Sequence, residues 1–357
     1  MYKRYKISFL IFIVSTLITP VCLFSQNEDD LATFLKAGEE DASKLIQAYT
    51  EPIIKTLSYG MTGGWYNTAA AHKPLGFDFG VTMNLAFVPT ADNYFNPDKL
   101  GLSSTYTFFN TTKNNPTQAP TIMGPKDDTD YTFSGNLDGN TGNGDESVTI
   151  SGPEGLNLKN EIGFAAIPVP MAQLGIGIIK NTDLKVRFMP NQKFGSSEIK
   201  MFGIGVMHDV KQHIKGIKLL PFDLSALVAY NSISGTSDLS NTDPSDERPD
   251  SPDGVLDYKF NSWVIQALIS KKISVLTGYA GVGYCIVNTK VDVKGQYTIE
   301  ATPFNFQLTD PVAIDFKNNT LRLTVGMRLK LGPVYFSGDY TLQKYNTLSV
   351  GFGFAVR

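Results

Sequence analysis

The stretch LGFDFGVTMNLAFV, residues 75–88, decides the fold class. Large apolar side chains take every second position from Leu75 to Phe87, and small or polar residues such as Gly76 and Thr82 stand between them. Side chains alternate faces along a β-strand, so this strand has one continuous apolar face. It is longer than an ordinary globular strand of about five or six residues, and it exceeds the about 9–11 residues that cross a bilayer at a tilt. The pattern predicts a membrane-spanning strand.

The same alternation returns at the C-terminal end, in three runs joined by short turns: 321–331, 334–342 and 348–356. Weaker versions fill the middle of the chain, at 172–178, 184–188, 202–206, 222–230, 263–269 and 276–286. Bacterial membrane barrels have an even number of such strands, and we expect roughly 12 to 14 here, a few more than the ten runs named. We therefore predict an all-β fold, a transmembrane antiparallel up-and-down β-barrel.

The first residues predict export from the cytoplasm. Lys3, Arg4 and Lys6 precede the apolar run 7–18, and Ser25 offers a small residue for cleavage, which is typical of a signal peptide. A single membrane anchor and a lipoprotein acylated at Cys22 are the alternatives. If Cys22 leaves with the signal, Cys285 has no disulfide partner within the chain, and we interpret it as a small packing residue.

Residues 27–57 predict an amphipathic helix, because apolar positions recur at spacings of three and four. Pro52 is expected to kink or split this helix near Glu51, and no second helix is expected. The predicted organisation is a signal peptide at 1–25, an N-terminal helix or plug at 26–70 and a barrel at 71–357.

Polar stretches between the strands come in two lengths. The short turns 180–183 and 344–346 suit the periplasmic side of a barrel, whereas the long stretches 110–129, 135–145 and 232–257 suit external loops. The acidic stretches 238–257 and 136–146 raise calcium binding as an alternative to solvated loops. Their spacing does not fit a twelve-residue EF-hand loop, and we predict no metal site and no cofactor.

Charged residues opposite the apolar faces are the candidate site residues. Charge on the lipid face costs about 2–4 kcal/mol near the bilayer midplane and little in a wet lumen, so these side chains are expected to face inward. They either form ion pairs that fill the interior or line a solute path. The candidates are Asp78, Lys185, Arg187, Asp223, Arg322, Arg328, Lys330 and Asp339.

Composition excludes several function classes. The formal charge is -3 and the sequence pI is near 5.7, so nothing indicates nucleic-acid binding. His208-Asp209 resembles part of a hydrolytic site, but no G-x-S-x-G sequence supplies a nucleophile. A strand end at a membrane surface also explains His208, and we predict that the protein is not an enzyme.

The order of signal, short N-terminal segment and alternating strands to the last residues resembles outer-membrane barrels of the long-chain fatty-acid transporter superfamily. Residues 201–208 followed by 220–224, and the signal ending 23–26, are similar to uncharacterised barrel proteins of Bacteroidetes. That superfamily carries an Asn-Pro-Ala motif in its plug, whereas this chain has Asn67-Thr68-Ala69, and it ends on Arg357 with its last aromatic residue at Phe354.

The inward polar face and the amphipathic segment favour passive transport of a hydrophobic or small solute across the outer membrane of a Gram-negative bacterium. The expected partners are outer-membrane lipid, the barrel-assembly machinery and a hydrophobic small molecule. A structural or surface-interaction barrel that acts through its external loops is the alternative, and an outer-membrane hydrolase is a third.

Overall fold

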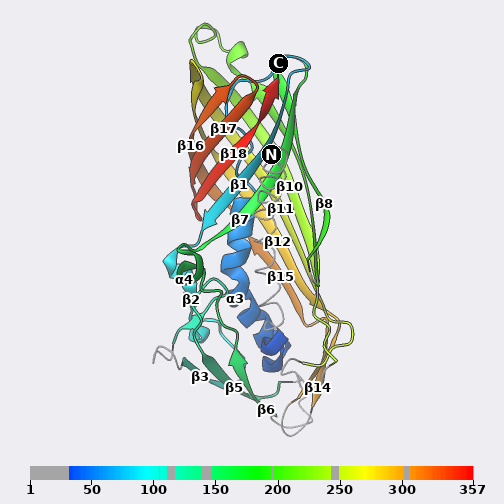
Figure 1. The fold of residues 1–357 in the computed structure, drawn as a ribbon. Coiled ribbons are helices and arrows are strands. Elements are labelled where there is room, and N and C mark those ends of the chain that lie inside the picture. The colour runs from blue at the N-terminus through cyan, green and yellow to red at the C-terminus, as the bar shows by residue number, and fades with distance from the viewer. Residues whose placement is uncertain are drawn as a thin grey trace, which may run out of the picture.

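The computed structural model describes residues 32–103, 105–110, 117–137, 146–194, 196–242, 249–300 and 305–356. The predicted signal peptide, with Cys22, lies outside the described residues. Among the described residues, ten antiparallel strands form a closed barrel (Figure 1). In the order of the chain they are β1 (Phe77–Phe87), β7 (Ala166–Gly177), β8 (Thr182–Phe194), β9 (Ser197–Asp209), β10 (Asp223–Asp238), β11 (Val255–Ile273), β12 (Leu276–Lys294), β16 (Thr320–Leu331), β17 (Val334–Leu342) and β18 (Thr347–Val356).

Each barrel strand pairs with the next barrel strand along the chain, and β1 pairs with β18 to close the ring. The predicted up-and-down barrel is confirmed, but it has ten strands rather than the expected 12 to 14. Alternation within a segment does not show which sheet the segment joins, and several short strands lie outside the ring. These are β2 (Tyr94–Phe95), β3 (Thr105–Asn110), β4 (Ala119–Pro120), β5 (Thr129–Gly135), β6 (Glu146–Gly152), β13 (Gln296–Ile299), β14 (Phe306–Thr309) and β15 (Val312–Lys317), which extends the sheet from the edge of β12.

The two ends of the barrel differ in their connections. The β7–β8, β11–β12 and β16–β17 turns lie at one end with Val356, together with the longer connection 210–222, and we call this end the short-turn end. The other, long-loop end carries the connections 88–165, 239–254 and 295–319. The turn at 343–346 also lies there, next to the end of β1. It is therefore opposite the turn before β8, and the expectation that 180–183 and 344–346 share one side is wrong, because successive turns of a meander alternate ends.

A band of exposed apolar side chains surrounds the barrel wall. On β16, every second residue from Leu321 to Leu331 belongs to it. That run is about 33 Å long at about 3.3 Å per residue, and the usual barrel tilt reduces it to a height of about 25 Å. The lipid-facing band of a membrane barrel has this height. Other members are Phe79, Ile176, Ile204, Val228, Ile265, Val282, Phe336, Val350 and Phe352.

Strands β10, β11 and β12 have 16, 19 and 19 residues and continue past this band at the long-loop end (Figure 1). The expectation of a loop over 232–257 is therefore wrong at both ends, since β10 runs to Asp238 and β11 starts at Val255. The outer face of this extension carries Ser, Thr, Asp and Lys residues. Because these residue types are common in loops, residues 232–257 were expected to form one.

The N-terminal segment folds as a 3-10 turn, η1 (Ala32–Ala37), followed by α3 (Glu39–Gly60). The chain breaks between them at Gly38, whose φ of 85° favours glycine, rather than at Pro52. Pro52 lies within a continuous α3, so the predicted split near Glu51 is wrong. None of the described helices is long and apolar enough to span a membrane.

Residues 88–165, which we call the cap, fold beside α3 at the long-loop end (Figure 1). They contain the sheet β3-β5-β6, the 3-10 turns η2 (Thr90–Asn93) and η3 (Pro97–Lys99), and α4 (Leu158–Ile162), a short helix that the sequence pattern did not predict. A further 3-10 turn, η4 (Lys211–His213), follows β9. Tyr49 of α3 packs with Tyr131 of the cap sheet and Phe260 of the wall in one hydrophobic core. α3 is thus enclosed between the cap and the extended wall.

Candidate functional site

Residues 61–76 run through the inside of the barrel and join α3 to β1. α3 begins at the long-loop end and β1 begins at the short-turn end, so the chain passes along the lumen from one end to the other (Figure 1). We call residues 39–76 the plug. They include most of the predicted plug segment 26–70, and continue six residues beyond it.

Arg187 of β8 joins the wall to the plug through several polar contacts. Its side chain is fully buried and donates hydrogen bonds to the carbonyl oxygens of Met61 at 3.1 Å and Gly63 at 2.8 Å. Its guanidinium also stacks over the ring of Trp65, 3.8 Å from the ring centroid, and donates to Gln173 at 3.0 Å. From β16, Arg322 donates to the carbonyl of Thr62 at 3.0 Å. Two arginines therefore hold three successive carbonyls just past the C-terminal end of α3, where the helix dipole favours cations.

On one side of the lumen, apolar side chains of the wall pack against the plug. Trp65 and Tyr66 are buried against Leu227, Val264 and Leu268 of the wall. Cys285 lies in the same cluster as a buried free thiol, as its interpretation as a packing residue predicted. Nearer the short-turn end, Ser225 donates to the carbonyl of Ala69 at 2.6 Å, and the hydroxyl of Ser270 accepts from the Ala69 amide at 2.9 Å.

A carboxylate fixes the plug where it leaves the lumen. Both the backbone N–H of His72 and its Nδ1 bond the buried Asp183 of β8, at 2.8 Å and 2.9 Å. Asp183 was assigned to a turn and was missed as a site residue. The alternation Asp183, Lys185, Arg187 places all three on one face, and this signal was available in the sequence.

The opposite side of the lumen, formed by β16, β17, β18 and β1, is small and polar. Asp78, Asn84 and Arg328 are buried there, and each has side-chain polar atoms that bond no protein group among the described residues. Arg328 stacks over Tyr335 at 4.3 Å. Asp339 accepts from Tyr279 at 2.9 Å.

The eight predicted lumen residues divide into two groups. Six are buried inside the wall, and two are half-buried near the short-turn end, where Asp223 accepts a hydrogen bond from Ser270 at 3.3 Å and Lys330 lies next to the β16–β17 turn. Only Arg187 and Arg322 donate to the plug through a side-chain hydrogen bond between described residues. The six buried residues are Asp78, Lys185, Arg187, Arg322, Arg328 and Asp339.

His208 lies at the short-turn end, with Nδ1 at 2.8 Å from the hydroxyl of Thr182 and Nε2 at 3.0 Å from Nε2 of His213. The described residues contain no group of three or more His, Cys, Asp or Glu side chains placed to hold a metal ion. Residues 243–248 of one acidic stretch and 138–145 of the other lie outside the described residues.

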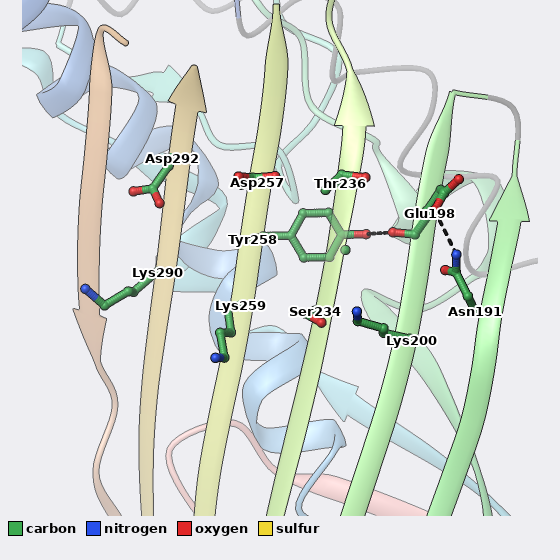
Figure 2. A pocket seen from close by; sticks show the side chains of 11 residues that line it. Asn191, Glu198, Lys200, Ser234, Thr236, Asp257, Tyr258, Lys259, Lys290 and Asp292 are labelled. Carbon is green, nitrogen blue, oxygen red and sulfur yellow. Dashed lines mark hydrogen bonds between the residues drawn. The ribbon is translucent and has the colours of Figure 1, made fainter. Parts of the chain in front are cut away.

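A second candidate site is a groove on the outer face of the extended wall, lined by β8 to β12 (Figure 2). Strand register aligns Lys200, Ser234, Lys259 and Lys290 in one row across four strands. Glu198, Thr236, Asp257 and Asp292 form the next row, farther from the apolar band. We call Lys200, Lys259 and Lys290 the lysine row, and Glu198, Asp257 and Asp292 the acidic row. Figure 2 shows the two rows one beyond the other.

A closed barrel with an apolar belt, polar interior and internal plug defines the class as an outer-membrane-type β-barrel. The chain belongs to a family of unknown function, DUF6588, whose model matches residues 2–356. Among curated proteins, none matches the chain.

Solved structures that resemble the chain are bacterial outer-membrane barrels. One is the translocator domain of the autotransporter NalP from Neisseria meningitidis, with 10% identity, a TM-score of 0.30, and coverage of 87% of this chain and 96% of that one. Another is Ail, the attachment invasion locus protein of Yersinia pestis, with 9% identity, a TM-score of 0.25, and coverage of 49% and 95%. The outer-membrane protease OmpT from Escherichia coli gives 8% identity, a TM-score of 0.24, and coverage of 78% and 93%. These likenesses concern the fold alone.

Proposed function

We propose that this protein spans the outer membrane of a Gram-negative bacterium and passively transports a small polar solute through a lumen gated by the plug. The observation that carries the proposal is a set of buried polar atoms in the lumen that no described protein group binds. Asp78, Asn84 and Arg328 have such atoms on one side, and Asn231 and Gln266 have them on the side that packs against Trp65 and Tyr66. Buried polar atoms are normally paired, so these atoms favour hydrated solutes over a fatty-acid chain.

The plug suits a gate because the wall does not depend on it. Every strand of the ring is hydrogen-bonded to two neighbouring barrel strands, and within residues 61–76 only Leu75 and Gly76 share backbone hydrogen bonds with described residues of the ring, at Gly177. Displacing residues 61–71 breaks contacts between side chains and carbonyls but leaves the ring closed. Transport by this route therefore needs a movement of the plug and no opening of the barrel.

Tethering the plug to the wall tests this gate. A Cβ built on Gly60 lies 3.8 Å from the Cβ of Ala86, the usual separation in a disulfide, although a methyl group of Val169 must shift. In a Cys285→Ala background, Gly60→Cys with Ala86→Cys is expected to suppress swelling of proteoliposomes in arabinose, and a reductant is expected to restore it. The single variant Ala86→Cys is the control. Equal swelling with the disulfide formed and reduced would contradict gating by the plug.

The direction of insertion follows from the connections, because outer-membrane barrels place short turns in the periplasm and long loops outside. The start of α3 then faces the cell exterior. With Cys285 buried, Glu40→Cys is expected to react with a membrane-impermeant maleimide on intact cells, whereas Lys180→Cys at the short-turn end is expected to react only after lysis. Both side chains are exposed. Labelling of Lys180→Cys alone on intact cells would reverse the orientation.

A further inference from the structure

The outer-wall groove lies just beyond the apolar band. Moving along the wall toward the band, the lysine row is followed by an uncharged row of Phe202, Ser232, Asn261 and Asn288. The next row contains Tyr230 and Trp263, whose rings are 5.0 Å apart. Tyr and Trp gather at membrane–water interfaces, so this pair marks the level of the lipid headgroups. The lysine row stands about 13 Å farther along β11 at about 3.3 Å per residue, and the side chain of a lysine reaches back toward the interface.

Two of the three lysines in the row lack an ion pair in the described part of the chain, although a hydrogen bond from Lys193 and, to a smaller extent, the nearby Lys200 lower the pKa of the Glu198 carboxyl. Lys200 and Lys259 have no ion-pair partner among the described residues, and Lys290 lies 3.4 Å from Asp315 in a pair whose side chains are both about two-thirds exposed. Two of the three residues of the acidic row are paired with other lysines: Glu198 with Lys193, and Asp257 with Lys294 at 2.5 Å. Three cations therefore lie within about 15 Å, the width of three strand spacings.

The position of the acidic row sets the side from which an anion approaches. From bulk solvent beyond the rim, an anion meets Glu198, Asp257 and Asp292 first. From the apolar band it meets uncharged residues and then the lysine row. The groove, of about 330 Å³, is at the small end of ligand sites and suits a headgroup rather than a whole lipid.

We propose that Lys200, Lys259 and Lys290 bind the phosphate of a lipid headgroup in the outer leaflet, whose acyl chains lie along the apolar band of β9 to β12. Assignment to the outer leaflet rests on the proposed insertion, with the long-loop end outside. The binding chemistry itself rests only on the geometry of the groove.

Native mass spectrometry of the full chain in detergent tests the binding, with dihexanoyl phosphatidic acid as the probe. We expect the triple variant Lys200→Gln, Lys259→Gln, Lys290→Gln to bind it at least tenfold more weakly than the wild type. The charge-matched triple Lys180→Gln, Lys215→Gln, Lys271→Gln, at exposed positions near the short-turn end, should bind within twofold of the wild type. Dihexanoyl glycerol, which lacks the phosphate, should bind the wild type and the first triple equally.

Unchanged phosphatidic acid binding by the lysine-row triple overturns the proposal. If inorganic phosphate binds the wild type as tightly as the lipid and competes with it, the site binds free anions. That result contradicts the proposal that the bound phosphate belongs to a lipid. The single variant Lys259→Gln, expected to weaken binding about threefold, covers the case in which the triple does not fold. Binding is measured in detergent without solute flux, so a failure to bind phosphatidic acid does not contradict the gating proposal. Equally, a barrel that conducts no solute does not contradict the lipid-binding proposal.

Discussion

Replacing Arg187 with Gln should release the plug. The change removes two charge-assisted hydrogen bonds, to the carbonyls of Met61 and Gly63, and the stack on Trp65. Hydrogen bonds from charged groups contribute about 1.5–3 kcal/mol each, and a desolvated cation–π contact contributes about 1–2 kcal/mol. The glutamine retains a donor and recovers part of the loss, so about 4 kcal/mol is a reasonable net cost to the docked plug. Since 1.4 kcal/mol is a factor of ten, the ratio of docked to released plug should fall about 1,000-fold.

The assay is single-channel recording in planar bilayers. Wild-type protein should open rarely, and Arg187→Gln should raise the open probability by up to the same factor until it saturates. Arg328→Gln is the matched control, because Arg328 is also a buried lumen arginine but stacks on Tyr335 of the wall and donates no hydrogen bond to the plug among the described contacts. It should open as rarely as the wild type.

Two results would refute the reasoning. One is an Arg187→Gln protein that remains silent although its gel mobility still shifts on heating, as a folded barrel does. The other is an Arg328→Gln protein that opens as often as Arg187→Gln, since the loss of any buried charge, rather than of the contacts with the plug, would then explain the effect.

Two further predictions concern the stability of the wall. Gly177→Ala should destabilise the protein by about 1–3 kcal/mol, because its Cβ would lie 2.3 Å from the carbonyl oxygen of Lys73. The control Gly278→Ala has nothing within 4 Å, and equal urea midpoints for the two variants in detergent would contradict this packing. Val325→Arg, in the middle of the apolar band, should cost about 2–4 kcal/mol in lipid vesicles, whereas Leu331→Arg at its edge should cost at most about 1 kcal/mol. Both positions are more than half exposed, so similar costs would place the band elsewhere.

The strands and their faces could be predicted because alternation is a local property. Residues 75–88 show it without any knowledge of the neighbouring strands, and the inward direction of Asp78, Arg187 and Arg322 follows from it. The expected count of 12 to 14 was too high: all ten runs of alternation joined the ring, whereas other alternating strands such as β5 and β6 pair in the cap sheet. Whether a strand joins the ring depends on hydrogen bonds to distant segments.

The two candidate sites depend on distant contacts for a similar reason. Arg187 contacts Trp65 across more than a hundred residues of chain, and no local sequence pattern predicts that contact. The lysine row exists only through the register of four strands, which aligns Lys200 with Ser234, and Ser234 with Lys259. Along the sequence these lysines are unremarkable surface positions. The amphipathic pattern of residues 27–57 did indicate a packed helix, but nothing in it showed that the helix is enclosed by the cap and the wall.

The passage of residues 61–76 along the lumen has a consequence for biogenesis. The seam between β1 and β18 joins the first and last strands of the ring, so it forms only after the whole wall has been made. Residues 61–76, which precede β1, occupy the inside of this cylinder, with α3 on the long-loop side. A factor that closes the seam must therefore either accommodate a barrel that is already occupied or leave an opening through which the N-terminal part enters afterwards.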